Sequence, residues 1–249
     1  MFEDLKEKKI LVTGASTGIG ASIVNLFSLY GAHVGIHYST SKKEAKKLRN
    51  AIVNKKGKAE IFQADLLNAK MRKSLIKSFI DVFGRIDVLI NNAGGIYGFK
   101  HFLELDEKSW DRTFALNAKA PFLLARDVFS LMKEKDGGKI INISSISAKY
   151  GGSVNSLHYG AAKAALDAIS VGLAREGAKH NILVNSIRCG FIDTPFHKKI
   201  GRQNLEDRIK LTLLKRAGQP IDIARMVLFL ASNAGDYITG EVFTVAGGD

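Results

Sequence analysis

The chain has 249 residues, 46% of them hydrophobic, and a formal net charge of +13. This apolar content excludes a disordered chain, and the length suits one or two domains with a large core. The single cysteine, Cys189, excludes an internal disulfide and a cysteine-based metal cluster. No apolar run is long enough to span a membrane, and the mixed charges of residues 1–6 are unlike a signal peptide, so we expect a cytoplasmic protein.

Short apolar runs alternate with amphipathic segments along the whole chain. The apolar runs are rich in valine and isoleucine and predict buried strands, and helical spacing predicts helices between them. The predicted strands are residues 10–13, 32–38, 59–63, 88–91, 139–144, 183–188 and 242–245, and the predicted helices are residues 19–30, 42–54, 71–83, 109–135, 159–179 and 221–232. This alternation predicts one doubly wound α/β domain over residues 1–249, a seven-stranded parallel sheet with helices on both faces.

Two features interrupt the regular pattern. Pro121 falls inside the fourth predicted helix and should kink it, because proline lacks the N–H that a helix interior needs. Residues 191–213 are the least regular long stretch and follow the sixth predicted strand. Ligands of doubly wound sheets bind beyond the carboxyl ends of the strands, so we expect residues 191–213 to form a lid over a substrate.

A glycine-rich segment separates the first predicted strand from the first helix. Gly14, Gly18 and Gly20 are spaced G-x-x-x-G-x-G. Glycines there permit a tight turn and a close approach of the backbone to phosphate, and the following helix directs its first N–H groups at a pyrophosphate. The position of this segment between a strand and a helix predicts a dinucleotide-binding site.

The glycine spacing resembles that of the short-chain dehydrogenase/reductase family, and further motifs follow in the family's order. These are Asn-Asn-Ala-Gly at residues 91–94, Asn117, the pair Ser144 and Ser145, and Tyr159-x-x-x-Lys163. The resemblance covers nearly the full chain and is greatest to bacterial 3-oxoacyl-acyl-carrier-protein reductases. It implies a Rossmann-type fold, hydride transfer between a nicotinamide cofactor and a carbonyl or secondary alcohol, and a homotetramer.

The catalytic group is predicted from Tyr159 and Lys163, which lie four positions apart and so share one face of a helix. A phenol with a pKa of about 10 is a poor base at neutral pH, and a nearby ammonium lowers that pKa. Tyr159 would donate a proton to a carbonyl oxygen or accept one from an alcohol. The resemblance implies that Lys163 also binds the nicotinamide ribose, that Ser145 binds the substrate oxygen, and that Asn117 anchors a water on the proton path.

The serine assignment has an alternative. The segment from Ser145 to Tyr159 is one residue longer than the commonest family spacing, so Ser147 remains a second candidate. Ser156 and His158, which precede the catalytic tyrosine, are candidates to line the substrate pocket.

The resemblance also assigns cofactor-binding positions, which follow the first four strands and the sixth. They are Gly14, Ser16, Thr17, Gly18, Ile19, Gly20, Tyr38, Ser39, Thr40, Ser41, Asp65, Leu66, Asn91, Ala93, Gly94, Tyr159, Lys163, Ile192 and Thr194. Cys189 stands where relatives usually have proline, so the loop after the sixth strand loses a fixed φ. We expect Cys189 to pack as a small hydrophobic residue.

The end of the second predicted strand bears on the choice between NAD and NADP. NAD-specific relatives place an acidic residue there, which binds the ribose diol and repels a 2′-phosphate. Residues 38–43 read Tyr-Ser-Thr-Ser-Lys-Lys and contain no acid. These hydroxyls, together with Lys42 and Lys43, could receive a phosphate, which favours NADP over NAD. Thr17 stands where many NADP-using relatives have arginine, so NAD remains open.

The positive charge and the histidines suggest other partners, which the sequence does not favour. The densest basic cluster, residues 42–58, surrounds apolar positions at helical spacing and predicts a solvated helix face. No aromatic residues alternate with its lysines to stack on bases, so we expect no nucleic-acid partner. His33 and His37 lie about 13 Å apart in an extended strand, too far to share an ion, so we expect no metal site.

The sequence therefore predicts an NADP-dependent carbonyl reductase or alcohol dehydrogenase with a small-molecule or acyl-thioester substrate and no membrane partner. A 3-oxoacyl thioester on acyl carrier protein is the expected substrate. The alternatives are an NAD-dependent sugar or polyol dehydrogenase and a cofactor-binding regulatory protein without turnover.

Overall fold

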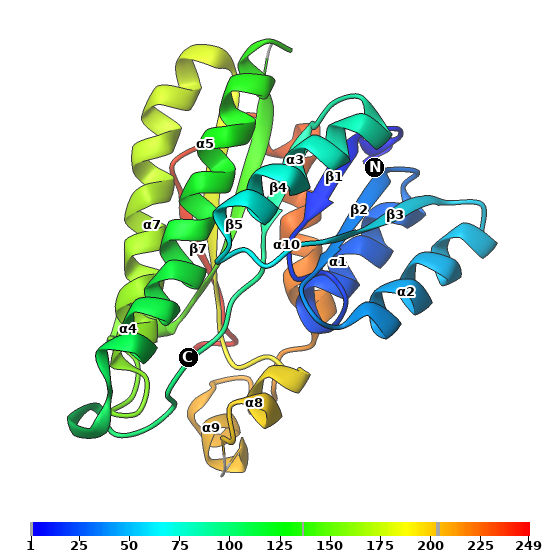
Figure 1. Ribbon diagram of the computed structural model, residues 1–249. Coiled ribbons are helices and arrows are strands. Elements are labelled where there is room, and N and C mark those ends of the chain that lie inside the picture. The colour runs from blue at the N-terminus through cyan, green and yellow to red at the C-terminus, as the bar shows by residue number, and fades with distance from the viewer. Residues whose placement is uncertain (1, 136, 203–204) are drawn as a thin grey trace.

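The computed structural model describes residues 2–135, 137–202 and 205–249. Over these residues seven parallel strands form one sheet in the order β3-β2-β1-β4-β5-β6-β7, which confirms the predicted fold class (Figure 1). The strands are β1 (Lys9–Val12), β2 (His33–Tyr38), β3 (Lys58–Gln63), β4 (Val88–Asn91), β5 (Gly138–Ser145), β6 (Ile182–Cys189) and β7 (Val242–Val245). The strand order reverses direction between β1 and β4, which is where doubly wound sheets bind ligands.

Helices cover both faces of the sheet, and alternate residues of each strand supply the two cores. Ile10 and Val12 of β1 pack with one set of helices and Leu11 packs with the other, because neighbouring side chains of a strand point to opposite faces. The first face carries α1 (Gly18–Leu29), α2 (Lys42–Asn54) and α10 (Pro220–Ala231). The second face carries α3 (Ala69–Phe83), α5 (Ala120–Lys133) and α7 (Leu157–Gly177).

The basic segment forms the amphipathic helix that its spacing predicts. Ala45, Leu48 and Ile52 of α2 are buried, whereas its lysines are exposed. The positive charge of this helix therefore lies on a solvated face.

The fourth predicted helix is divided before Pro121. An α-helix, α4 (Glu107–Phe114), leads into a π-helical segment, Ala115–Lys119, and then into α5. Pro121 occupies the first turn of α5, where a missing N–H costs little. The interruption predicted from the sequence thus takes the form of a wide helical turn, a feature that often occurs at functional sites.

Residues 191–213, predicted to be irregular, contain two short helices, α8 (Pro195–Lys199) and α9 (Leu205–Leu211). Both lie beyond the carboxyl ends of the strands (Figure 1). The two ends of this stretch lie close together, because Gly218 donates its N–H to the carbonyl of Phe191 (2.9 Å) and accepts from the N–H of Asp193 (2.8 Å). A short α6 (Ser147–Tyr150), absent from the sequence-based prediction, follows β5.

No helix in the described ranges has the length and apolar character needed to cross a membrane.

Candidate functional site

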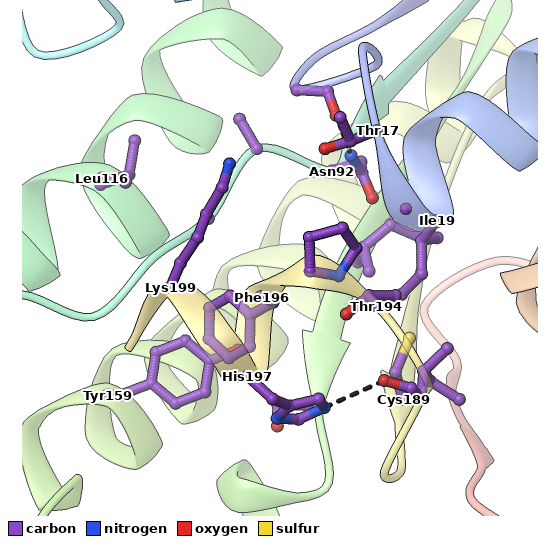
Figure 2. A pocket seen from close by; sticks show the side chains of 18 of the residues that line it. Thr17, Ile19, Asn92, Leu116, Tyr159, Cys189, Thr194, Phe196, His197 and Lys199 are labelled. Atoms are coloured by element: carbon purple, nitrogen blue, oxygen red, sulfur yellow. Dashed lines mark hydrogen bonds between the residues drawn. The ribbon is translucent and has the colours of Figure 1, made fainter. Parts of the chain in front are cut away.

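A cavity of about 370 Å³ lies at the carboxyl ends of the strands (Figure 2). Its wall combines the glycine loop after β1, the residues that follow β2, β3 and β4, the end of β5, the start of α7, and the residues after β6. One elongated site therefore brings together segments spread over most of the chain.

The glycines of the first loop are required by its geometry. Gly14 and Gly18 have φ values of +60° and +57°, which side chains other than glycine rarely adopt. A Cβ on Gly14 would lie 2.9 Å from the Cα of Ala93, and a Cβ on Gly20 would lie 2.5 Å from Nδ2 of Asn92. Gly14 and Gly18 line the cavity, whereas Gly20 lies outside its wall and permits close packing.

His37 supports this loop from β2, a role that the sequence analysis did not predict. Its Nδ1 accepts the N–H of Gly14 (3.0 Å), and its Nε2 lies 3.0 Å from the carbonyl of Ala64, to which it donates. Burial lowers the pKa of His37 to about 4, so the ring is neutral at neutral pH and can make both bonds. A histidine in a buried strand opposite a glycine loop is the sequence signal for this role.

Asn92 supports the loop from the other side. Its Nδ2 donates to the carbonyls of Thr13 (2.8 Å) and Gly14 (2.9 Å), and Oγ1 of Thr13 accepts the N–H groups of Asn92 and Ala93 (both 3.0 Å). Asn92 lines the cavity, although the sequence analysis selected Asn91.

Asn91 is directed into the sheet, away from the cavity. Its Nδ2 donates to Oδ1 of Asn142 (2.9 Å) and to the carbonyl of Pro121 (3.3 Å). The Asn91 side chain is therefore a polar group of the core that connects β4 with β5 and α5.

The predicted catalytic residues Ser145, Tyr159 and Lys163 all line the cavity. Lys163 is only 3% exposed, and its Nζ donates to the carbonyl of Ile143 (2.8 Å). The same Nζ lies 5.8 Å from the ring centroid of Tyr159. Ser145 hydrogen-bonds to the Tyr159 side chain. The structure thus brings a hydroxyl, a phenol and an ammonium together at one end of the cavity.

Burial controls the protonation of this group. It raises the pKa of Tyr159 to about 12, and the hydrogen bond with Ser145 only partly counteracts it. Burial also lowers the pKa of Lys163 to about 8. The net shift of the phenol pKa is therefore upward, and desolvation is its largest cause. At neutral pH the phenol is protonated, which is the form that a proton donor needs.

Asn117 of the π-helical segment lies behind the cavity wall. Its Nδ2 donates to the carbonyls of Gly95 (2.7 Å) and Thr113 (2.8 Å), and its Oδ1 accepts the N–H of Gly95 (3.2 Å). A Cβ on Gly94 would lie 2.8 Å from Oδ1 of Asn117 and 3.3 Å from Nζ of Lys163. Glycine at position 94 therefore leaves room for the side chains of Asn117 and Lys163.

The remaining predicted positions are placed as follows. Ser16, Thr17, Ile19, Tyr38, Ser39, Thr40, Ser41, Asp65, Leu66, Ala93, Gly94, Ile192 and Thr194 line the cavity, as do the alternative serines Ser144 and Ser147. Lys42, Lys43, Ser156 and His158 do not line it, and Nε2 of His158 instead hydrogen-bonds to the carbonyl of Tyr97 (2.8 Å).

Cys189 ends β6 and lines the cavity with 6% of its surface exposed. Burial raises the pKa of its thiol to about 12, so very little reactive thiolate exists at neutral pH. This environment agrees with the predicted packing role.

The segment after β6, residues 191–214, supplies residues that the sequence analysis missed. Phe196, Lys199, Arg202 and Arg208 join the cavity wall, and the Phe196 ring centroid lies 6.2 Å from that of Tyr159 (Figure 2). We call residues 191–214 the α8–α9 segment. Its composition gave no motif, and only its contacts show which of its side chains reach the cavity.

Comparisons with known proteins identify the family of this chain. A sequence model of a family described as enoyl-(acyl carrier protein) reductase matches residues 14–249. The 3-oxoacyl-[acyl-carrier-protein] reductase FabG of Thermotoga maritima is 33% identical over 244 residues, which cover 98% of each chain. The protein belongs to the short-chain dehydrogenase/reductase family.

Solved structures of other family members superpose closely. A blue fluorescent protein from a metagenomic library, in complex with NADPH, has a TM-score of 0.91 and 33% identity, covering 98% of each chain. A 7α-hydroxysteroid dehydrogenase complexed with NADH and 7-oxo glycochenodeoxycholic acid has a TM-score of 0.92 and 31% identity, covering 99% of this chain and 96% of its own. The present short-chain dehydrogenase/reductase is therefore an NAD(P)-linked oxidoreductase that acts on CH–OH and C=O groups, as the motifs predicted.

The glycine loop fits such a dinucleotide. Two positive-φ glycines leave the backbone open toward the cavity, and Gly18 begins α1, whose first N–H groups and positive dipole end suit a pyrophosphate. Among the described residues no group of three His, Cys, Asp or Glu side chains is placed to hold a metal ion.

Proposed function

We propose that this short-chain dehydrogenase/reductase reduces a carbonyl compound with NADPH, with a 3-oxoacyl thioester on acyl carrier protein as the reference substrate. The observation that carries the proposal is the protonated phenol of Tyr159, held beside Ser145 and Lys163 in the same cavity as the glycine loop. The relationship to 3-oxoacyl-[acyl-carrier-protein] reductases supports the substrate class.

Different residues along the cavity would bind different parts of the cofactor. Ser16, Thr17, Gly18 and Ile19 would bind the pyrophosphate, Asp65 and Leu66 would contact the adenine, and the Lys163 ammonium would hold the nicotinamide ribose. Ile192 and Thr194 would orient the carboxamide from the loop after β6. When bound, the cofactor supplies or accepts a hydride.

The catalytic group acts on the substrate oxygen. Ser145 would hold the carbonyl oxygen against the Tyr159 hydroxyl, which donates its proton as negative charge develops on that oxygen. Lys163 would stabilise the resulting phenolate, and Asn117 would anchor a water through which the proton is replaced. The protonated phenol is the form that reduction needs, and the reverse oxidation would need the phenolate, which the positive charge of Lys163 would stabilise.

The preference for NADP rests on the hydroxyls that follow β2. Ser39, Thr40 and Ser41 line the cavity at the position where an NAD-specific acid would stand. The lysines that begin α2 lie outside the wall, so these hydroxyls and neighbouring backbone would carry the contact to a 2′-phosphate. NAD-linked oxidation of a sugar or polyol is the second candidate, because Thr17 offers no cation for that phosphate.

We further propose a cytoplasmic homotetramer. Exposed apolar side chains on and near α4 and α7, among them Phe102, Trp110 and Leu157, support burial of this surface by another copy of the chain.

The test is a measurement of NADPH and NADH oxidation with acetoacetyl thioesters on acyl carrier protein and with a panel of neutral ketones and aldehydes. We expect turnover with NADPH and at least about tenfold higher kcat/KM than with NADH. Tight cofactor binding without turnover of any carbonyl would overturn the proposal in favour of a regulatory protein.

A further inference from the structure

Cationic side chains gather at the substrate end of the cavity. Lys199, Arg202 and Arg208 of the α8–α9 segment line it together with Lys163. Among the described residues of its wall, the one carboxylate is Asp65, which follows β3 and belongs to the adenosine side. The substrate end therefore carries positive charge that the wall itself does not balance.

The two arginines differ in their partners. Arg208 is paired with the carboxylate of Asp249, whose side chain is only 6% exposed. Within the described part of the chain, no carboxylate pairs with Arg202, and its guanidinium lies 5.4 Å from the ring centroid of Phe99. Arg202 is thus a partly buried cation held against an aromatic ring, with its charge uncompensated.

Arg202 lies close to the reacting end of the site. Burial and the neighbouring Arg208 lower its pKa, while its interaction with Tyr159 acts in the opposite direction. The backbone N–H of Arg202 donates to the carbonyl of His197 (3.0 Å). His197 follows Phe196, whose ring packs beside Tyr159 (Figure 2). A substrate with its carbonyl oxygen at Tyr159 would extend past Phe196 toward this guanidinium.

We propose that Arg202 binds a carboxylate of the substrate, so that the enzyme prefers oxo acids to neutral carbonyl compounds. A partly desolvated guanidinium without a counterion is unfavourable, and a carboxylate both neutralises it and matches its planar pair of donors. Lys199, exposed at the same end, adds attraction for an anion. The inference rests on the proposed carbonyl reduction and departs from its reference substrate, because a 3-oxoacyl thioester has no free carboxylate and the preferred substrate would be a free oxo acid.

The phosphates of the cofactor could also supply the anion that Arg202 binds, but the structure favours a carboxylate of the substrate. The glycine loop and the first turn of α1 already form a separate place for the pyrophosphate. Arg202 instead interacts with the proton donor Tyr159.

The experiment compares short 2-oxo and 3-oxo acids with their methyl esters, using NADPH and four proteins: wild type, Arg202→Gln, Arg202→Lys and Arg175→Gln. Arg175 is an exposed residue of α7 outside the cavity wall, so its variant controls for the loss of one positive charge.

We expect wild type to favour the acids. Arg202→Gln should raise KM for the acids about tenfold to hundredfold, with kcat and the ester KM nearly unchanged. Arg202→Lys should retain part of the preference, and Arg175→Gln all of it.

Equal kcat/KM for acids and esters in wild type would overturn the proposal, as would an unchanged acid-to-ester ratio in Arg202→Gln. A rise in KM for NADPH alone would assign the guanidinium to the cofactor and also overturn it. Calorimetric titration of the NADP-bound protein with an oxo acid and its ester gives a readout without turnover. If no carbonyl is reduced, the proposed function fails, but tighter binding of the acid that is lost in Arg202→Gln still supports the role of Arg202.

Discussion

The two ends of the cavity are built differently. At the cofactor end the glycine loop presents backbone to the cavity, and the side chains of buried His37 and half-buried Asn92 hold that loop. At the substrate end the α8–α9 segment contributes long side chains, including Lys199 and Arg202, that project into the site. The comparison teaches that cofactor binding is built into the sheet itself, whereas substrate choice depends on side chains that can change without altering the sheet.

Tyr159→Phe should give the largest effect, because it acts where the two ends meet. Removing the hydroxyl removes the proton donor while leaving the ring packed against Phe196. We expect kcat for reduction to fall by about 10²–10⁴-fold, with little change in NADPH affinity. Steady-state kinetics and a fluorescence titration with NADPH would separate the two quantities. Undiminished turnover would contradict the assigned role.

His37 should make the cofactor end sensitive to acid. Burial lowers its pKa to about 4, whereas the unfolded chain titrates near its ordinary value of 6.5. As the pH falls below 6.5 the unfolded chain binds a proton that the folded protein does not, so stability present above that pH is lost toward pH 4. The expected loss is of the order of 3 kcal/mol in the free energy of unfolding.

The measurement is urea unfolding at a series of pH values for wild type and His37→Gln. The variant lacks the titrating ring, so its free energy of unfolding should fall less steeply between pH 6.5 and 4. Equal slopes for the two proteins would show that His37 does not couple folding to protonation.

Gly14→Ala should test whether the glycine loop is as tightly constrained as its contacts indicate. The new Cβ would lie 2.9 Å from the Cα of Ala93 at a φ of +60°. We expect a loss of about 1–3 kcal/mol in the free energy of unfolding, together with weaker NADPH binding. Gly172→Ala in α7 is the matched control, because nothing lies within 4 Å of its Cβ. A Gly14→Ala protein that binds and unfolds like the control would refute the constraint.

Ser39→Asp should have the smallest of these effects. It would show how much the preference for NADPH over NADH depends on the side chains after β2. A carboxylate after β2 would repel a 2′-phosphate, raising KM for NADPH by about tenfold, roughly 1.4 kcal/mol, while leaving KM for NADH unchanged or lower. Initial rates with both cofactors measure the shift. An unchanged ratio would place the 2′-phosphate away from Ser39.

The sequence was sufficient for those features that arise locally or from a shared motif. The periodicity of apolar residues predicted each strand of the sheet, and the spacing of Tyr159 and Lys163 predicted their common face. Asn91 and Asn92 could not be distinguished in this way, because which of the two faces the cavity depends on contacts with β1 and β5. The raised pKa of Tyr159 was not predicted for a similar reason, since desolvation depends on everything packed around the ring.

The α8–α9 segment was the least predictable part. Its helices are short and its side chains face the cavity from a stretch with no recognisable periodicity. The role proposed for Arg202 depends on residues far away in the sequence, such as Phe99 and Tyr159, so the sequence alone could not indicate it.

The paired hydrogen bonds of Gly218 to Phe191 and Asp193 have a consequence for how such enzymes diversify. Because the two ends of the stretch between these anchors are hydrogen-bonded to each other, we expect that it can be exchanged for that of a relative if its contacts with the C-terminal residues, such as Arg208 with Asp249, are matched. Chimeras cut at these anchors would inherit new substrate preferences while keeping the same dinucleotide chemistry.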